Sequence, residues 1–398
     1  MGLLVQKFGG TSLATPERIQ RAALRVTKEK EKGHRLVVVV SAMGEETDAL
    51  LALADHFKLP DYSREHDMLL ATGEQKSMAL LAIALIKLGC KARSLTAAQA
   101  GIHASGAYGY ARIVDIEIQK IMLPLDQGDV VVIAGFQGMM GEELTTLGRG
   151  GSDLTAVALA AALKADECQI FTDVEGVHFA DPRLVPIAHK LDTINFKEML
   201  ALSHLGAKVL HHRAVLLAKK MQVPLRVLSS FVEGKGTVVA EECPEDSGVM
   251  GIACQDQQVL VRLSFRQDDG ILSAITGYLA RIHIMISSMG YRENEQIELV
   301  FVIPKETWSH AHPALLVLLG STEHAITVRE PLAQISIIGK GIHLSADIRE
   351  KFHQVLRECG ANILYSTGSE VALSALTDIA HLSVVMEELY QVFHFKSI

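Results

Sequence analysis

The sequence predicts an α/β protein in which a mostly parallel sheet is sandwiched by helices, followed by two smaller α+β units. Residues 36–40 and 130–136 are unbroken apolar runs, which are typical of strands buried on both faces. Such strands alternate with helical segments through the first part of the chain. Beyond a polar linker the pattern changes to shorter units that recur once. We therefore expect domains at 1–240, 249–320 and 321–398.

The elements of the first domain follow from local signals. Strands are expected at Leu3–Phe8, Leu36–Val40, Lys91–Leu95, Val130–Phe136, Cys168–Asp173 and Pro224–Leu228. Helices are expected at Thr47–His56, Asp67–Leu88, Leu154–Leu163, Phe196–Ser203 and Ala207–Met221. A further helix begins at Pro16, with Thr15 as its N-cap, and ends near Gly33. In a parallel sheet of this kind, ligands bind beyond the carboxyl ends of the strands.

The C-terminal part shows two successive units of similar order. The first has strands at Val259–Phe265, His283–Ser287 and Ile297–Ile303 and a helix at Ile271–Ala280. The second has strands at Gln334–Ile338, Asn362–Tyr365 and Glu370–Ala375 and helices at Ile348–Cys359 and His381–Gln391. A single α+β domain with accidental internal similarity is the alternative interpretation.

Composition narrows the class of protein. The chain has 398 residues, of which 49% are hydrophobic and 21% charged, so a large core is expected and disorder is not. The net charge of −8 argues against nucleic acid as a partner. The five cysteines are scattered, which favours reduced thiols and a cytoplasmic location over a disulfide framework or a zinc site. We expect no signal peptide and no membrane-spanning segment.

A glycine-rich stretch lies between a predicted buried strand and an alanine-rich helix. It runs Thr145-Thr146-Leu147-Gly148-Arg149-Gly150-Gly151-Ser152-Asp153. Glycines let backbone N–H groups approach an anion, and Ser152 or Asp153 can cap the helix, whose positive end favours negative charge. Arg149 adds a planar fork suited to a carboxylate or phosphate. The alternative is a tight turn followed by a capped helix.

A second glycine-rich stretch follows the first strand. Lys7-Phe8-Gly9-Gly10-Thr11-Ser12 places a lysine at the strand end and two glycines after it, which can form an anion-binding nest. It has neither the P-loop order nor the Rossmann fingerprint, and the chain has no Gly-x-Ser-x-Gly elbow. Two such loops with Lys7, Arg149 and Lys208 suit phosphoryl transfer, which needs positioning and charge neutralisation above all.

Seven ordered motifs between Met1 and about Phe231 make the chain resemble the aspartate kinases. They are KFGGTS at 7–12, SAMG at 41–44, TGE at 72–74, TLGRGGSD at 146–153, TDVEGV at 172–177, ADPR at 180–183 and GAKVLH at 206–211. The resemblance implies the amino-acid-kinase fold. It also implies transfer of the ATP γ-phosphate to the side-chain carboxylate of L-aspartate, giving 4-phospho-L-aspartate for lysine, threonine and methionine biosynthesis.

The resemblance also implies roles for individual residues. Lys7 and Asp153 match the catalytic lysine and the carboxylate that orients it. L-aspartate would be bound by Ser41, Thr47, Glu74, Arg149, Gly150, Gly151 and Ser152. ATP would be bound by Lys7, Phe8, Gly9, Gly10, Thr172, Asp173, His178, Asp181, Arg183 and Lys208. Mg²⁺ would accompany ATP, held mainly by phosphate oxygens and water, with no protein ligand named.

Simpler interpretations stand beside these roles. Glu74 can be a helix-surface glutamate, Asp153 a second N-cap, and the segment 181–183 a plain turn. The whole chain can also be an enzyme of the same fold that acts on glutamate, N-acetylglutamate or UMP, or a non-catalytic amino-acid sensor.

The two C-terminal units resemble the ACT domains of these enzymes. That resemblance implies an amino-acid effector and a homodimer or higher homo-oligomer. The usual Pro-Gly at the first strand–helix turn is Asp269-Gly270 here, and Ser287-Ser288 stands near the place of the effector-binding Gln-Asn. We therefore expect a weak or altered effector response.

Overall fold

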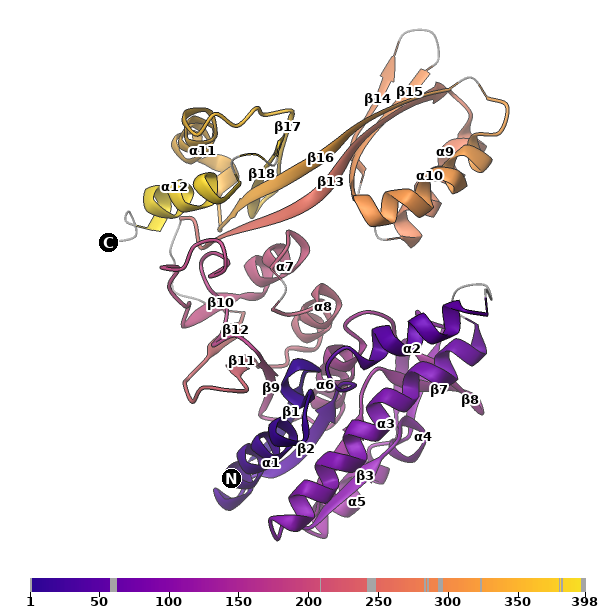
Figure 1. Cartoon of the computed structure of the whole chain (residues 1–398), viewed down its shortest axis with the longest axis vertical. Coiled ribbons are helices and arrows are strands. Elements are labelled where there is room, and N and C mark those ends of the chain that lie inside the picture. Colours follow the sequence, from indigo (N-terminus) through magenta and orange to yellow (C-terminus); the bar gives the residue numbers. More distant parts are fainter. Residues whose placement is uncertain are drawn as a thin grey trace. The chain divides into compact units, whose positions relative to one another are not determined.

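The computed structural model describes residues 2–57, 63–207, 209–241, 248–282, 284, 286–292, 296–322, 324–378, 380 and 382–394. It divides into two compact units (Figure 1). The first comprises Met1–His178, His189–His204 and Lys208–Glu245, and the second comprises Phe179–Ala188, Leu205–Ala207 and Asp246–Ile398. The predicted boundaries at 1–240, 249–320 and 321–398 stay a prediction.

The first unit is built on an eight-stranded sheet with the strand order β10-β12-β11-β9-β1-β2-β6-β3. These strands are β1 (Leu3–Phe8), β2 (Arg35–Val40), β3 (Ala92–Leu95), β6 (Val130–Ala134), β9 (Glu167–Thr172), β10 (Thr193–Asn195), β11 (Leu225–Ser229) and β12 (Thr237–Ala240). All neighbours pair in parallel except β11 and β12. The predicted mostly parallel sheet is confirmed, because apolar strands buried on both faces need helical crossovers.

Helices cover both faces of this sheet. They are α1 (Pro16–Glu31), α2 (Glu46–Asp55), α3 (Arg64–Lys87), α4 (Ala97–Ala100), α5 (Gln119–Asp126), α6 (Gly151–Ala162), α7 (Phe196–His204) and α8 (His212–Met221), with a short 3₁₀ turn at Thr11–Leu13. Helix α1 begins as predicted, because the Thr15 side chain accepts a hydrogen bond from the Arg18 N–H and proline occupies the first position.

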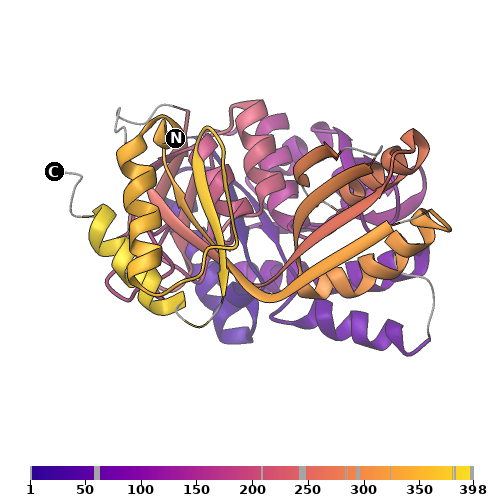
Figure 2. The same cartoon turned by 90° about the horizontal axis from the view of Figure 1, so that it is seen from above.

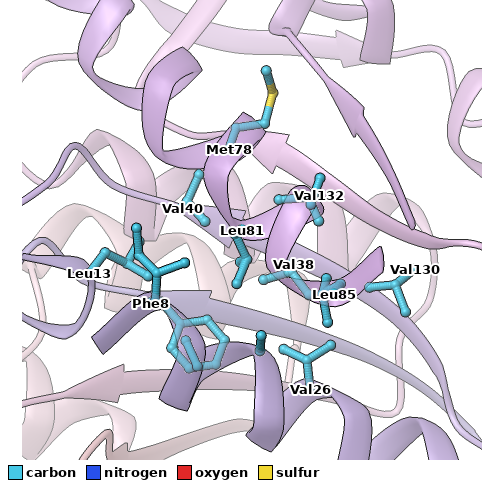
Figure 3. Close-up of a cluster of buried hydrophobic side chains, with 14 of the residues drawn as sticks. Phe8, Leu13, Val26, Val38, Val40, Met78, Leu81, Leu85, Val130 and Val132 are labelled. Carbon is cyan, nitrogen blue, oxygen red and sulfur yellow. The ribbon is translucent and has the colours of Figure 1, made fainter. Parts of the chain in front are cut away.

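One hydrophobic core of the first unit lies between the sheet and helices α1 and α3. Phe8, Val38, Val40, Val130 and Val132 from the strands meet Val26 of α1 and Met78, Leu81 and Leu85 of α3 (Figure 3). Helix α6 packs against β1, β2 and β9. The carboxyl ends of β1, β2 and β9 therefore lead into the loops that carry most of the predicted site residues.

Helix α3 alone, among the helices that the structure describes, is long and apolar enough to cross a membrane. About half of its most apolar stretch is buried inside the protein, and it packs against β2, β3 and β6. Such burial is typical of a core helix, which passes the same composition test.

A small second sheet in this unit was not predicted. It has the order β5-β4-β7-β8, with β4 at Ile102–Ser105, β5 at Arg112–Ile116, β7 at Gln137–Met140 and β8 at Glu143–Thr146. The hairpin β7–β8 stands between the buried strand β6 and helix α6, which the sequence analysis joined by a loop alone. These strands have four or five residues each, too short for a clear period-2 pattern.

Several helix starts differ from the prediction, and two of them lie beside the predicted site residues. Helix α6 begins at Gly151 with Gly150 as N-cap, so the prediction that Ser152 or Asp153 caps it is wrong. Both lie inside the first turn, because Gly150 at φ 73° makes the bend instead. Helix α8 begins at His212 and not at Ala207, and His211 is its N-cap.

The second unit contains a six-stranded antiparallel sheet of order β14-β15-β13-β16-β18-β17. Its strands are β13 (Gly251–Arg266), β14 (Ile286–Arg292), β15 (Gln296–Pro304), β16 (His324–Ile338), β17 (Tyr365–Gly368) and β18 (Ala372–Asp378). Strands β13 and β16 pair along almost their whole length and run through both halves of the sheet (Figure 2). The first half is therefore completed by residues that the sequence analysis assigned to the second unit.

Four helices belong to this sheet. They are α9 (Asp269–Arg281), α10 (Lys305–Leu319), α11 (Ala346–Glu358) and α12 (Leu382–His394), with a 3₁₀ turn at Ile342–Leu344. Helix α10 was not predicted, although Trp308, Ala311 and Leu315 bury one helical face in the core formed with α9. The strand expected at 362–365 begins only at Tyr365. The one expected at His283–Ser287 includes residues outside the described ones, and β14 begins at Ile286.

Candidate functional site

The stretch 7–12, here named the Lys7 loop, is held by the backbones of its neighbours. The Gly9 N–H donates to the Phe171 carbonyl at 3.2 Å, and the Gly44 N–H donates to the Gly10 carbonyl at 2.9 Å. A Cβ on Gly10 would lie 2.9 Å from the Gly44 oxygen, so only glycine fits. The loop is thereby fixed at the carboxyl end of β1.

Lys7 and Asp153 form the central ion pair of this region. The Lys7 Nζ lies 2.6 Å from the Asp153 Oδ1, although the two residues are 146 positions apart by number. Their side chains are 12% and 11% exposed. Asp153 stands in the first turn of α6, where the helix dipole also favours its negative charge. The pair holds an ammonium group at a glycine-lined strand end, which suits an anionic ligand.

Glu74 is buried in the middle of α3, so the alternative of a helix-surface glutamate is wrong. Its Oε1 accepts a hydrogen bond from the Ala42 N–H at 2.9 Å, and its Oε2 has no hydrogen-bond partner among the described residues. Burial raises the pKa of Glu74 from 4.5 to about 8, partly offset by the Ala42 hydrogen bond and by the charge of Lys7. A buried, half-satisfied carboxyl group of this kind is suited to a cationic group of a ligand.

The stretch 147–150, here named the Arg149 loop, joins β8 to α6. Gly148 and Gly150 both have positive φ, at 76° and 73°. A Cβ on Gly150 would lie 2.1 Å from the Cγ of His211, so the imidazole packs directly on the glycine. Arg149 is exposed and makes no ion pair or hydrogen bond with any residue in the described part of the chain. Its guanidinium is therefore available to a ligand.

The other predicted aspartate-binding residues surround the same strand ends. Ser41 follows β2, where its N–H donates to the Phe8 carbonyl at 3.1 Å. Thr47 lies half-buried in the first turn of α2. Gly151 and Ser152 are buried in the first turn of α6, and Ser152 packs against Gly135 at the end of β6.

The predicted nucleotide-binding residues are less concentrated. Thr172 ends β9, and its hydroxyl donates to Asp173 at 3.0 Å. His178 forms an isolated antiparallel bridge with Lys190. Asp181 and Arg183 belong to the second unit, where the Arg183 guanidinium pairs with Asp181 at 2.6 Å. Lys208 lies outside the described residues.

Metal binding by the protein was not predicted and stays untested. In the described ranges, no group of three or more His, Cys, Asp and Glu side chains is arranged to hold a metal ion.

Two charged residues that support the Arg149 loop were missed by the sequence analysis. Asp67 in α3 is fully buried and accepts four hydrogen bonds from the loop and strand residues around it. Arg213 in α8 donates to the carbonyls of Leu147 and Ala111, the latter at 3.4 Å. Asp67 follows Arg64, Glu65 and His66 in the polar first turn of α3, so its sequence context gave no signal, and that of Arg213 gave none either.

The chain is similar to known amino acid kinases and aspartokinases. The model of the amino acid kinase family matches residues 2–229. An aspartokinase of Geobacillus stearothermophilus is 43% identical, over 99% of this chain and 97% of that protein. The crystal structure of E. coli aspartokinase III in complex with aspartate and ADP matches with a TM-score of 0.82 and 26% identity, covering 98% of this chain and 99% of that one. The same enzyme in complex with lysine and aspartate matches with a TM-score of 0.75 and 25% identity, over the same shares of the two chains.

The parallel sheet, the glycine loops and these matches define a kinase of the amino acid kinase family, that is, a phosphotransferase that uses a nucleotide. Within that family the chain belongs to the aspartokinases. The predicted fold and the predicted family are both confirmed.

Proposed function

We propose that the protein transfers the γ-phosphoryl group of ATP to the side-chain carboxylate of L-aspartate, giving 4-phospho-L-aspartate and ADP. The main observation behind this proposal is the Lys7–Asp153 ion pair at a glycine-lined strand end. The charge of Lys7 also lowers the pKa of the buried Glu74, so the two groups interact. Relatives that bear the name aspartokinase support the choice of substrate.

In this reaction an aspartate oxygen forms a bond to the γ-phosphorus while the bond to the β,γ-bridging oxygen breaks. The attacking carboxylate is ionised near neutral pH, with an ordinary pKa of about 3.9, so no general base is required. Both reactants are negative, and their repulsion is the main obstacle. Lys7, oriented by Asp153, supplies the positive charge that offsets it, and the N–H groups of Gly9 and Gly10 supply backbone donors.

The α-groups of the substrate would be held by residues of opposite charge. Arg149 is exposed on its loop and presents a fork that fits the α-carboxylate. Glu74 has one oxygen without a partner in the described part of the chain, and that oxygen fits the α-ammonium group. Because the pKa of Glu74 is raised to about 8, binding of a cation would draw the proton off this carboxyl group. Ser41, Thr47 and the α6 residues 150–152 would line the same site.

The nucleotide would be bound by the Lys7 loop with Thr172, Asp173, His178, Asp181, Arg183 and Lys208. Mg²⁺ would accompany ATP and neutralise phosphate charge, held mainly by phosphate oxygens and water.

We further infer a cytoplasmic biosynthetic enzyme that serves lysine, threonine and methionine formation and works as a homodimer or higher homo-oligomer. The C-terminal unit would bind an amino-acid effector, with a weak or altered response. Support comes from the E. coli enzyme, which is known in complex with lysine. Turnover is measured with millimolar lysine, with millimolar threonine and with both together. Strong inhibition in any of these assays would refute a weak response.

The activity is tested by trapping the acyl phosphate with hydroxylamine while ADP release is followed. L-aspartate, L-glutamate, N-acetylglutamate and UMP are offered in turn. Aspartate alone should yield both ADP and a hydroxamate. ADP release with UMP or N-acetylglutamate, or no turnover with any of the four, would contradict the proposal.

A further inference from the structure

Asp67 is a buried acid that ties the strand before the Arg149 loop to helix α3. Its Oδ2 accepts hydrogen bonds from the Gly109 N–H at 2.9 Å, the Thr145 hydroxyl at 2.9 Å and the Thr146 N–H at 2.8 Å. Its Oδ1 accepts from the Thr146 hydroxyl at 2.7 Å. All of these donors are buried or part of the backbone, and the carboxylate side chain is fully buried. One side chain of α3 therefore fixes the end of β8.

The loop that follows is fixed by contact with the same set of residues. Gly148 approaches Gly109 so closely that a Cβ would lie 2.7 Å from the Gly109 oxygen. The Ala111 N–H donates to the Thr146 carbonyl at 3.0 Å. Asp67 thus controls both the strand that enters the Arg149 loop and the segment on which that loop rests, without touching Arg149 itself.

Helix α3 also carries Glu74, seven residues beyond Asp67. Both side chains are buried. Seven residues correspond to about two helical turns and a rise of about 10 Å, which returns the chain to the same face of the helix. The helix therefore connects rigidly the carboxyl group that would bind the α-ammonium with the support of the loop that would bind the α-carboxylate.

We propose that Asp67 is a positioning residue that sets the separation between the Arg149 guanidinium and the Glu74 carboxyl group, and so the fit of an α-amino acid. The proposal rests on the proposed function, because it assigns these two groups to the two ends of the substrate backbone. Asp67 acts on the substrate only through the Arg149 loop. Loss of the Asp67 carboxylate should weaken binding of the substrate α-carboxylate and leave binding of the α-ammonium group unchanged.

Two small competitive inhibitors report separately on binding of the α-carboxylate and of the α-ammonium group. Succinate is aspartate without its amino group, so its binding relies on Arg149. β-Alanine is aspartate without its α-carboxylate, so its binding relies on Glu74. In the full-length Asp67→Ala variant, the inhibition constant of succinate should rise at least tenfold and the KM for aspartate should rise with it. The inhibition constant of β-alanine and the KM for ATP should change less than twofold.

Asp67→Asn provides rescue by a conservative change. The amide oxygen can accept the three bonds made to Oδ2, and the amide N–H can donate to the Thr146 oxygen once that hydroxyl turns. This variant should bind succinate within about threefold of the unaltered protein. Asp129→Ala is the matched control, since Asp129 is a buried acid of the same unit that pairs with Arg93. It should lower stability without changing either inhibition constant.

If Asp67→Ala fails to fold, Thr146→Val carries the test, because it removes only one hydroxyl from the network. It should raise the succinate constant about threefold and leave that of β-alanine unchanged. Equal weakening of both inhibitors, or unchanged succinate binding in a folded variant, would overturn the proposal. Lack of aspartate phosphorylation by the unaltered protein would instead overturn the proposed function.

Discussion

The Lys7 loop and the Arg149 loop are both rich in glycine and both follow a strand, yet they are held in different ways. The Lys7 loop is secured by backbone hydrogen bonds to the neighbouring strand end at Phe171 and to Gly44. The Arg149 loop has one backbone hydrogen bond of this kind, from the Leu147 N–H to the Phe136 carbonyl at 2.8 Å. It is further secured by two charged side chains from helices, the buried Asp67 and the half-buried Arg213. One loop is part of the sheet architecture, whereas the other depends on particular side chains.

This difference predicts where each loop is vulnerable. Single side-chain changes should leave the glycines of the Lys7 loop in place, because Gly9 and Gly10 are held by main-chain groups. Only its far end, at Thr11 and Ser12, accepts hydrogen bonds from the side chains of Arg18 and Ser230. The Arg149 loop should be distorted more easily when one supporting side chain is altered, because Asp67 and Arg213 bond directly to the residues that enter it. Substitutions in the first loop should therefore change chemistry, and those around the second should change substrate affinity.

The largest effect is expected from Lys7→Met, which removes the ammonium group and keeps the side-chain length. We expect kcat to fall about 10³-fold, as for the loss of one preorganised charge-stabilising group. Asp153 would lose its partner, yet the backbone supports of the loop remain, so the circular dichroism spectrum should not change. A variant that retains more than a tenth of the turnover would contradict the role given to Lys7.

Gly150→Ala should break the Arg149 loop. The added methyl group would lie 2.1 Å from the Cγ of His211, at a φ of 73°. We expect the KM for aspartate to rise at least about tenfold, the size of effect that a 1.4 kcal/mol loss of binding produces, with little change in the KM for ATP.

Gly128→Ala is the matched control for that change. Gly128 also has a positive φ, of 85°, but a Cβ there meets nothing within 4 Å. It should lose about 1 kcal/mol of stability through backbone strain, with unchanged kinetics. Similar kinetics in the two variants would mean that the His211 contact does not hold the Arg149 loop.

The mildest test concerns pH and Glu74. Because burial raises its pKa to about 8, the unliganded carboxyl group is mostly protonated at pH 7 and must lose a proton to pair with an ammonium group. The dissociation constant of aspartate should fall several-fold between pH 7 and pH 9, measured by calorimetry in buffers of different ionisation enthalpy. Glu74→Gln should abolish both this dependence and the proton release, and a pH-independent constant in the unaltered protein would count against the assignment.

The raised pKa of Glu74 also affects folding stability, which should fall with rising pH whereas aspartate affinity should increase. The folded-state pKa of Glu74 lies above its unfolded value of 4.5, so the folded protein binds the proton more tightly. Its contribution to stability should therefore fall as the pH rises from about 4.5 to about 8. The stability of Glu74→Gln minus that of the unaltered protein, measured by thermal unfolding, should therefore be larger at pH 9 than at pH 6.

The sequence predicted what local signals encode. Thr15 and Pro16 mark a helix start, the valine-rich runs mark buried strands, and the glycines after Lys7 mark a turn at a strand end. All of these depend on residues close together in the chain. The pairing of Lys7 with Asp153 was predicted only through resemblance to a family, because nothing local connects the two.

What was not predicted depends on contacts between distant residues. The donors to Asp67 lie 42 to 79 positions away, so no window of sequence contains the network. Gly150, the N-cap of α6, is packed against His211, a residue far away in the sequence. The short hairpin before α6 was missed because Gln137–Met140 is stabilised by its pairing partner and by Gln137, which donates to the Ala71 carbonyl in α3 at 3.3 Å.

Strands β13 and β16, with 16 and 15 residues, restrict where the protein can be divided. A gene fragment ending at residue 320 would retain β13 and lose β16, leaving a long row of amide and carbonyl groups without partners. Such a fragment would be prone to aggregate through its bare edge. An engineer who wishes to separate catalysis from regulation should therefore cut ahead of Gly251 and keep the remaining chain whole.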